Sequence, residues 1–237
     1  MNRFVQVSFF IIHALILVKA QSNDYCSKPS LFISSQFSGV PKSYSNVIYD
    51  SVIDYSGKKV AVAMNIYLPQ PLSTPNIAAI RPLMVWIHGG SFVGGSKEDM
   101  NLFAQNSATV GYVSAAIGYR LGIPNLNPVT CNNVWSEFFK AGYRAVQDVK
   151  NGINFLKKNA ASYGIDTNYI FIAGYSAGAI TALNCAFMDE EDLKPMKSVI
   201  EGLGPLSKIS NIKGVLSISG TLFDDCYIDE ADKTPIF

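Results

Sequence analysis

The chain alternates short apolar runs with polar and glycine-rich segments. Residues 83–87, 112–119, 169–173 and 214–219 are almost continuously apolar, which is typical of strands buried on both faces of a sheet. Between the second and third of these runs, apolar residues recur at spacings of three and four from Ala141 to Leu156 and predict a long amphipathic helix. The pattern therefore predicts strands and helices in alternation.

Other segments extend this alternation. Residues 46–55 and 60–68 are typical of two strands joined by a turn at residues 56–58, while residues 101–110 and 179–188 are typical of helices. Alternation of this kind predicts an α/β fold in which helices cover both faces of a mostly parallel sheet, with the first hairpin adding antiparallel edge strands. Ligands of such sheets bind beyond the carboxyl ends of the strands.

The N-terminal segment has the pattern of a secretory signal peptide. Arg3 precedes an apolar run over residues 4–18, and Val18-Lys19-Ala20 places small residues before a cleavage site. A membrane anchor would need about 20 apolar residues with few polar interruptions, so we expect residues 1–20 to be removed. We then expect a secreted, extracellular protein with no membrane span, an irregular arm at residues 21–45 and one domain at residues 46–237.

Composition excludes several classes of protein. Of the 237 residues, 49% are hydrophobic and 16% are charged, and the formal net charge is +1. A chain this apolar can bury a core, which argues against disorder. The 19 basic residues are scattered along the chain and balanced by 18 acidic ones, so no basic patch indicates a nucleic-acid partner.

Four cysteines follow the predicted signal peptide, at spacings that contain no paired metal-ligand pattern. Export would carry them into an oxidising compartment. We therefore expect one or two structural disulfides, a buried thiol at Cys185 on a predicted helix, and no metal site. The four are Cys26, Cys131, Cys185 and Cys226.

One glycine-rich motif places a serine where chemistry is expected. Residues 174–178 (GYSAG) fit the pattern G-x-S-x-G directly after a predicted strand and directly before a predicted helix. A turn that sharp brings neighbouring chain close, so its outer positions cannot carry bulky side chains. Ser176 is thereby held at a helix N-terminus, where the amide of Ala177 and the helix dipole favour a developing oxyanion.

A second motif, His88-Gly89-Gly90, follows the predicted strand at residues 83–87. Its two glycines let backbone amides approach a tetrahedral intermediate without a Cβ in the way. Because both motifs follow strands, we expect them at the same edge of the sheet. The glycine loop also precedes the serine motif in the order that an oxyanion loop and a nucleophile elbow require.

As a set, these motifs resemble those of α/β-hydrolases of the secreted carboxylesterase and lipase type. The resemblance covers about residues 64–224. It is carried by residues 86–92 (WIHGGSF), residues 118–122 (GYRLG), Asp148 with the helix that leads to residues 163–166 (YGID), and residues 174–178 (GYSAG). Two positions depart from the family, because Ser91 replaces the third glycine of HGGG and Ala179 stands where many relatives have another glycine.

The resemblance implies a role for each residue of the two motifs. It implies that Ser176 is the nucleophile and that the amides of Gly89, Gly90 and Ala177 form the oxyanion hole. It also implies that His88 orients the oxyanion loop, while a catalytic acid and a histidine base follow the serine along the chain.

Histidine is scarce in this chain. The only two are His13, in the predicted signal peptide, and His88, so no histidine follows the serine. Residues 233–237 resemble the opening of a further strand. We therefore expect a C-terminally truncated chain that lacks the last strands and the catalytic histidine and is inactive alone. Asp224 and Asp225 are candidates for the acid, although we favour solvated or capping roles for these loop carboxylates.

The expected function is hydrolysis of a small-molecule carboxylic ester through an acyl-enzyme, without a cofactor. The ester is left open, since selectivity depends on loops such as residues 122–136. Two alternatives remain, a non-catalytic cholinesterase-like binding or adhesion module and a serine peptidase on the same fold. A strained serine has no use in a binding module, which favours the enzyme.

Overall fold

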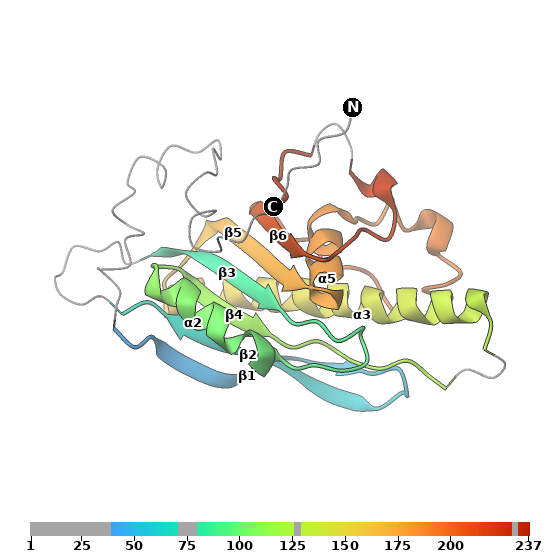
Figure 1. Cartoon of the computed structure of the whole chain (residues 1–237), viewed down its shortest axis with the longest axis horizontal. Coiled ribbons are helices and arrows are strands. Elements are labelled where there is room, and N and C mark those ends of the chain that lie inside the picture. Colours follow the sequence, from blue (N-terminus) through green and yellow to red (C-terminus); the bar gives the residue numbers. More distant parts are fainter. Residues whose placement is uncertain (1–38, 71–79, 126–128, 229–231) are drawn as a thin grey trace.

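The computed structural model describes residues 39–70, 80–125, 129–228 and 232–237, which fold around a six-stranded sheet (Figure 1). The predicted signal peptide and most of the predicted arm lie outside these ranges. The strand order is β1-β2-β4-β3-β5-β6. The strands are β1 Lys42–Ile53, β2 Lys59–Leu68, β3 Arg81–Ile87, β4 Val113–Ile117, β5 Ile165–Tyr175 and β6 Ile212–Ile218.

The strand pairings divide the sheet into a parallel and an antiparallel part. β3 pairs in parallel with both β4 and β5, and β5 pairs in parallel with β6. β2 pairs antiparallel with β4 on one side and with β1 on the other. In the turn between β1 and β2, the Gly57 amide donates to the Asp54 carbonyl at 3.1 Å. The predicted mostly parallel sheet with an antiparallel edge hairpin is thus confirmed.

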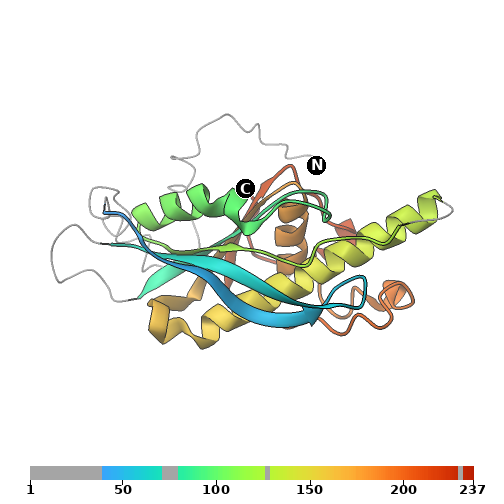
Figure 2. The ribbon, with the colours of Figure 1, turned by 90° about the horizontal axis from the view of Figure 1, so that it is seen from below.

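Helices cover both faces of the sheet, as predicted. α2 (Asn101–Thr109) lies on one face, and α3 (Cys131–Lys158) and α5 (Ala177–Phe187) lie on the other (Figure 2). Within the described ranges, no helix is long and apolar enough to cross a membrane. The short elements are α4 (Ala160–Tyr163) and the 3-10 turns η4 (Lys97–Met100), η5 (Lys194–Met196) and η6 (Asp225–Tyr227).

The central strand β3 is continuously apolar because both of its faces are buried. Leu83, Val85 and Ile87 pack in the core on the α3 and α5 side, where they are fully buried. Met84 and Trp86 pack on the α2 side. Since both faces are covered, no position of this strand favours a polar residue. The strand then delivers the first glycine-rich motif to the carboxyl edge of the sheet.

β1 and α3 are among the elements whose starts differ from the prediction. β1 begins at Lys42, inside the segment assigned to the irregular arm, because residues 42–44 extend the pairing with β2. α3 begins at Cys131, well before the apolar periodicity does, because the Thr130 side chain accepts a hydrogen bond from the Asn133 amide and caps the helix. These first turns extend past the sheet (Figure 2) and are largely exposed, so no apolar stripe marks them.

The last described residues pair with β6. The Phe237 amide donates to the Val215 carbonyl at 2.8 Å, and the Val215 amide donates to the Pro235 carbonyl at 2.9 Å. The bridge between Val215 and Ile236 is parallel. Residues 235–237 therefore lie beside β6 as a further parallel strand would, in keeping with the sequence prediction for this segment.

The expected disulfides do not form among the described cysteines. Cys131 and Cys226 are exposed free thiols, the first at the solvent-exposed start of α3 and the second in η6. Cys185 is a buried free thiol on α5, as predicted, and burial raises its pKa to about 12. Cys26 lies outside the described residues.

Candidate active site

The two glycine-rich motifs meet at the carboxyl edge of the sheet, as the sequence predicts. β3 and β5 are neighbouring parallel strands, with Ile87 opposite Gly174, and one motif follows each strand. A Cβ placed on Gly89 would lie 3.3 Å from the Ser176 Cβ and 2.8 Å from the Tyr175 carbonyl oxygen. The backbone of the first loop therefore lies directly against the serine.

Ser176 occupies a strained turn between β5 and α5. Its φ of 53° and ψ of −121° lie in a region that residues with a Cβ rarely adopt. Its amide donates to the Ile218 carbonyl of β6 at 2.8 Å. A Cβ on Gly174 would lie 2.2 Å from the carbonyl carbon of Gly178, and one on Gly178 would lie 2.1 Å from the Ile87 carbonyl oxygen. The two glycines thus let the turn close, and the serine stays partly exposed.

α5 begins at Ala177, directly after the serine. The first amides of a helix have no acceptor within the helix and carry the positive end of its dipole. The Ala177 amide belongs to this group, and the residue is buried. The N-terminus of α5 therefore favours negative charge beside Ser176.

The loop after β3 is a tight backbone turn. Gly90 has a φ of 112°, and its carbonyl accepts hydrogen bonds from the amides of Val93 at 3.0 Å and Gly94 at 2.9 Å. Ser91, at the place of the third glycine of HGGG, has a φ of 53°, and Phe92 has a φ of 62°. The loop thus keeps a left-handed backbone at Ser91 despite the Cβ, and it buries the Phe92 side chain completely.

His88 is packed inside the protein. It is 1% exposed, and its ring stacks on the Tyr119 ring with centroids 4.3 Å apart and an interplanar angle of 8°. Its Nδ1 lies 2.8 Å from the Gly89 carbonyl oxygen, and since a carbonyl only accepts, Nδ1 carries the proton. Burial lowers the pKa of His88, so the ring is neutral at pH 7. The histidine is therefore engaged within its own loop.

Tyr119 has no role assigned from the sequence, although it lies within the GYRLG segment. It is 5% exposed, and its hydroxyl donates to the His88 carbonyl at 2.9 Å. Phe92 packs against it edge-on, with ring centroids 6.2 Å apart. The available signal was topological, because β4 pairs in parallel with β3 and the residues after both strands reach the same edge of the sheet.

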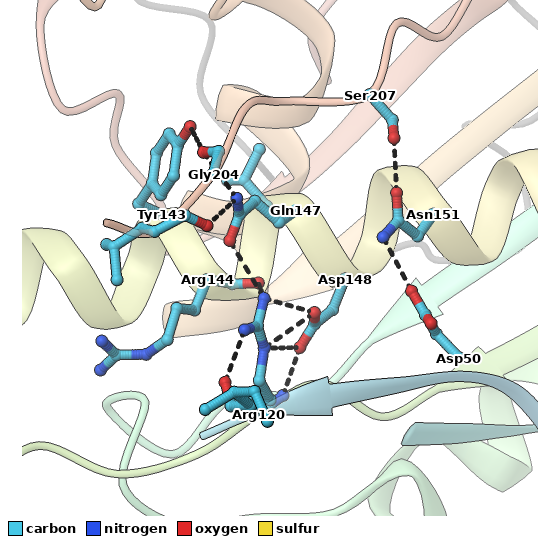
Figure 3. Close-up of polar contacts among 12 residues, drawn as sticks. Asp50, Arg120, Tyr143, Arg144, Gln147, Asp148, Asn151, Gly204 and Ser207 are labelled. Atoms are coloured by element: carbon cyan, nitrogen blue, oxygen red, sulfur yellow. Dashed lines mark hydrogen bonds and ion pairs between the residues drawn. The ribbon is translucent and has the colours of Figure 1, made fainter. Parts of the chain in front are cut away.

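Arg120 and Asp148 anchor the chain directly after Tyr119 (Figure 3). The Arg120 Nε lies 2.9 Å from both carboxylate oxygens, and the Arg120 amide donates to Oδ2 at 2.8 Å. The Asp148 side chain is completely buried. The guanidinium also donates to the Ile53 carbonyl at 2.8 Å and to Gln147 Oε1 at 3.0 Å. α3 thereby ties the segment after β4 to the edge hairpin.

The same network continues from α3 to residues 203–205. Gln147 Nε2 donates to three successive carbonyls at residues 203–205, and the Tyr143 hydroxyl donates to the Gly204 carbonyl at 2.7 Å (Figure 3). A cavity of about 710 Å³ lies beside this segment, lined by residues of the 190–205 stretch and Tyr143. Neither glycine-rich motif lines that cavity, so it is separate from the candidate site.

Asp224 and Asp225 lie on an exposed segment after β6. Asp224 accepts a hydrogen bond from the Cys226 amide at 3.0 Å and caps η6, and hydrogen bonds from Cys226 lower its pKa. The favoured interpretation, a capping carboxylate, is confirmed for Asp224. Both acids and Cys226 could offer metal ligands within 4.8 Å of one another, but all three are exposed, and such groups are common without an ion.

A serine on a left-handed strand-to-helix turn, with a glycine loop at the end of the neighbouring parallel strand, defines the α/β-hydrolase class. Solved esterases share the fold. Esterase B from Lactobacillus rhamnosis matches with a TM-score of 0.53 at 19% identity, over 87% of this chain and 57% of that one. Esterase 2 of Thermogutta terrifontis, phosphorylated by paraoxon, matches with a TM-score of 0.53 at 21% identity, over 76% and 57%.

The family model described as BD-FAE matches residues 64–221, and the chain belongs to this family. Gut esterase 1 of Caenorhabditis elegans is 33% identical over 133 residues, which cover 53% of this chain and 20% of that protein. Carboxylesterase 3B of Mus musculus is 32% identical over 122 residues, which cover 50% and 19%. The matched region thus spans about a fifth of the length of these curated relatives.

Proposed function

We propose that this chain carries the nucleophile and the oxyanion hole of a serine carboxylic-ester hydrolase. The observation that carries the proposal is the position of Ser176, strained and partly exposed at the N-terminus of α5, with the Gly89 backbone against it. Such strain persists only where the surroundings enforce it, and it clusters at active sites. Esterases among the relatives support the same reaction class.

In the proposed reaction, the Ser176 Oγ attacks the carbonyl carbon of a small-molecule ester while a base takes the hydroxyl proton. The amides of Gly89, Gly90 and Ala177 stabilise the negative charge that develops on the carbonyl oxygen. The tetrahedral intermediate then expels the alcohol, and water hydrolyses the acyl-enzyme. Acyl transfer of this kind is carried by protein groups and water alone.

A general base must accept the serine proton. His88 is the one histidine of the described residues, and its ring is engaged with Tyr119 and the Gly89 carbonyl. We assign His88 to the orientation of the oxyanion loop and not to the base. Without a base, the 237-residue chain is expected to react only slowly at Ser176, where the oxyanion hole still stabilises negative charge. We expect it to be inactive in ester turnover, because no base activates water to release the acyl group.

A fluorophosphonate probe tests this assignment. We expect slow labelling of the purified chain at Ser176, faster at higher pH because hydroxide replaces the base, with no plateau near the ordinary histidine pKa of about 6.5. Added imidazole supplies a base and should accelerate labelling. Ser176→Ala should not be labelled, whereas Ser198→Ala, which removes an exposed serine elsewhere, should be labelled like the unmodified chain.

Other outcomes would favour the other functions. Absence of labelling even with imidazole, with no difference from Ser176→Ala, would favour a binding or adhesion module. Faster cleavage of short peptide amides than of short acyl esters would favour a peptidase. Labelling that levels off near pH 6.5 and is abolished by His88→Gln would make His88 the base and overturn its assignment to the loop.

Secretion is part of the same proposal. The apolar run and small residues before Ala20 support cleavage there, and exported protein would then begin at Gln21. N-terminal sequencing of exported protein checks this position. Retention of residues 1–20 would contradict it.

A further inference from the structure

We propose that Tyr119 is a positioning residue for the oxyanion loop, and that with His88 it holds the two loop amides beside Ser176. The inference rests on the proposed function, since it concerns the amides assigned to the oxyanion hole. It adds a residue from a third strand end, that of β4, to a site otherwise built from the ends of β3 and β5.

The geometry of the peptide group carries the argument. A trans peptide is planar, so its C=O and N–H point in opposite directions. The carbonyl of His88 and the amide of Gly89 belong to one peptide group, and the carbonyl of Gly89 and the amide of Gly90 belong to the next. A hydrogen bond that fixes either carbonyl therefore fixes the direction of the following amide.

Both carbonyls are held from inside the protein. The Tyr119 hydroxyl donates to the His88 carbonyl at 2.9 Å, and His88 Nδ1 donates to the Gly89 carbonyl at 2.8 Å. The first bond turns the Gly89 amide away from Tyr119, and the second turns the Gly90 amide away from the imidazole. Because the Gly89 backbone lies against Ser176, amides held this way are available to an oxyanion there.

Tyr119 acts on both bonds. Its ring stacks on the imidazole at 4.3 Å and 8°, and this contact orients the Nδ1 donor. The stacked rings restrict rotation of the His88 imidazole, and the hydrogen bond from the Tyr119 hydroxyl restricts rotation of the peptide group that follows His88. The Tyr119 hydroxyl also lies 3.5 Å from the Gly89 carbonyl oxygen, too far for a strong hydrogen bond. Tyr119 therefore holds the Gly89 amide directly and the Gly90 amide mainly through His88.

The surroundings of Tyr119 keep it in place. The carbonyl of Gly118 accepts a hydrogen bond from the Tyr49 hydroxyl at 2.6 Å, and the next residue along, Arg120, is fixed by Asp148. The Gly122 amide donates to the Phe92 carbonyl at 2.7 Å. The segment after β4 is thus bound on both sides of the tyrosine, so the tyrosine can serve as a rigid support.

Backbone and imidazole NMR of the full chain tests the inference without any reaction at Ser176. In the unmodified chain we expect rigid Gly89 and Gly90 amides, with order parameters near 0.85, and one Nδ1–H tautomer of His88. Tyr119→Phe keeps the stack and loses the hydroxyl, so the Gly89 order parameter should fall below about 0.6 while Gly90 and the His88 tautomer stay. Tyr119→Leu should loosen both amides and give mixed tautomers.

Tyr112→Phe is the matched control, since Tyr112 is a buried tyrosine directly before β4 that packs on Phe171. It should leave Gly89, Gly90 and His88 unchanged. If Tyr119→Leu does not fold, Tyr119→Phe alone decides, because a merely structural tyrosine would leave the Gly89 amide as rigid as before. An unchanged order parameter of the Gly89 amide in Tyr119→Phe would overturn the inference. Rigid loop amides together with no fluorophosphonate labelling would instead overturn the proposed function.

Discussion

The nucleophile turn and the oxyanion loop lie at the ends of neighbouring strands, yet different contacts give them their shapes. The turn at Ser176 is closed by backbone packed on backbone, with Gly174 and Gly178 only four positions apart. The loop after β3 is held by the side chains of His88 and Tyr119, which lie 31 positions apart. Local glycines therefore determine the first structure, and distant side chains determine the second.

This difference predicts how each region responds to substitution. A local turn fails when one glycine acquires a Cβ, because backbone atoms cannot move aside. A loop held by distant side chains depends on every element between them. Its supports include Tyr119, after β4, and Asp148, on α3.

The largest effect is expected at Asp148, which supports the oxyanion side from α3. Asp148→Ala leaves the buried Arg120 guanidinium without its carboxylate, and breaking a buried pair costs about 3–5 kcal/mol of unfolding free energy. Urea unfolding measures it. Glu191→Ala removes one partner of an exposed pair with Lys194 and should change the free energy of unfolding little, because solvent screens exposed pairs. Equal losses in the two variants would contradict the importance of the buried pair.

A somewhat smaller effect is expected at the nucleophile turn. In Gly178→Ala the new methyl group would lie 2.1 Å from the Ile87 carbonyl oxygen, which should cost about 3 kcal/mol of unfolding free energy. Gly202→Ala is the control, since its Cβ meets nothing within 4 Å and only its φ of 81° is strained; we expect about 1 kcal/mol there. Urea unfolding compares the two. A smaller loss for Gly178→Ala than for the control would show that the turn can open.

The smallest effect is a pH dependence from His88. Burial lowers its folded pKa, so between that value and the ordinary pKa of about 6.5 the unfolded chain binds more protons. The free energy of unfolding should therefore fall as the pH falls from 7, by at most about 1.4 kcal/mol for each pH unit. Urea unfolding at several pH values measures this slope, which His88→Gln should reduce. If an NMR titration gave His88 a pKa at or above the ordinary value, it would contradict the expected effect of burial.

Much of the arrangement of strands and helices was predictable, because apolar patterns within short segments indicate these elements. Apolar runs of strand length gave β3, β4 and β6, and helical spacing from Ala141 to Leu156 located the core of α3. The start of α3 was missed because its exposed first turns carry no stripe, and only a Thr130 cap marks them. The start of β1 was missed because an exposed edge strand needs no apolar alternation.

The expected disulfides are not seen among the described cysteines, for a different reason. Cysteine spacing and a predicted export signal bear on which bonds are chemically permitted, but not on which sulfur atoms meet. In the fold, Cys185 is buried on α5, while Cys131 and Cys226 are exposed.

By itself the sequence determined the strand–helix alternation, the two glycine-rich turns and the serine at the carboxyl edge of the sheet. Each depends on residues within a few positions of one another, where steric limits and periodicity act directly. Only the tertiary structure decided that His88 is enclosed by Tyr119 and that Asp148 holds Arg120. Those contacts join segments about 30 positions apart, and the packing of strands and helices that brings them together is not written in any local pattern.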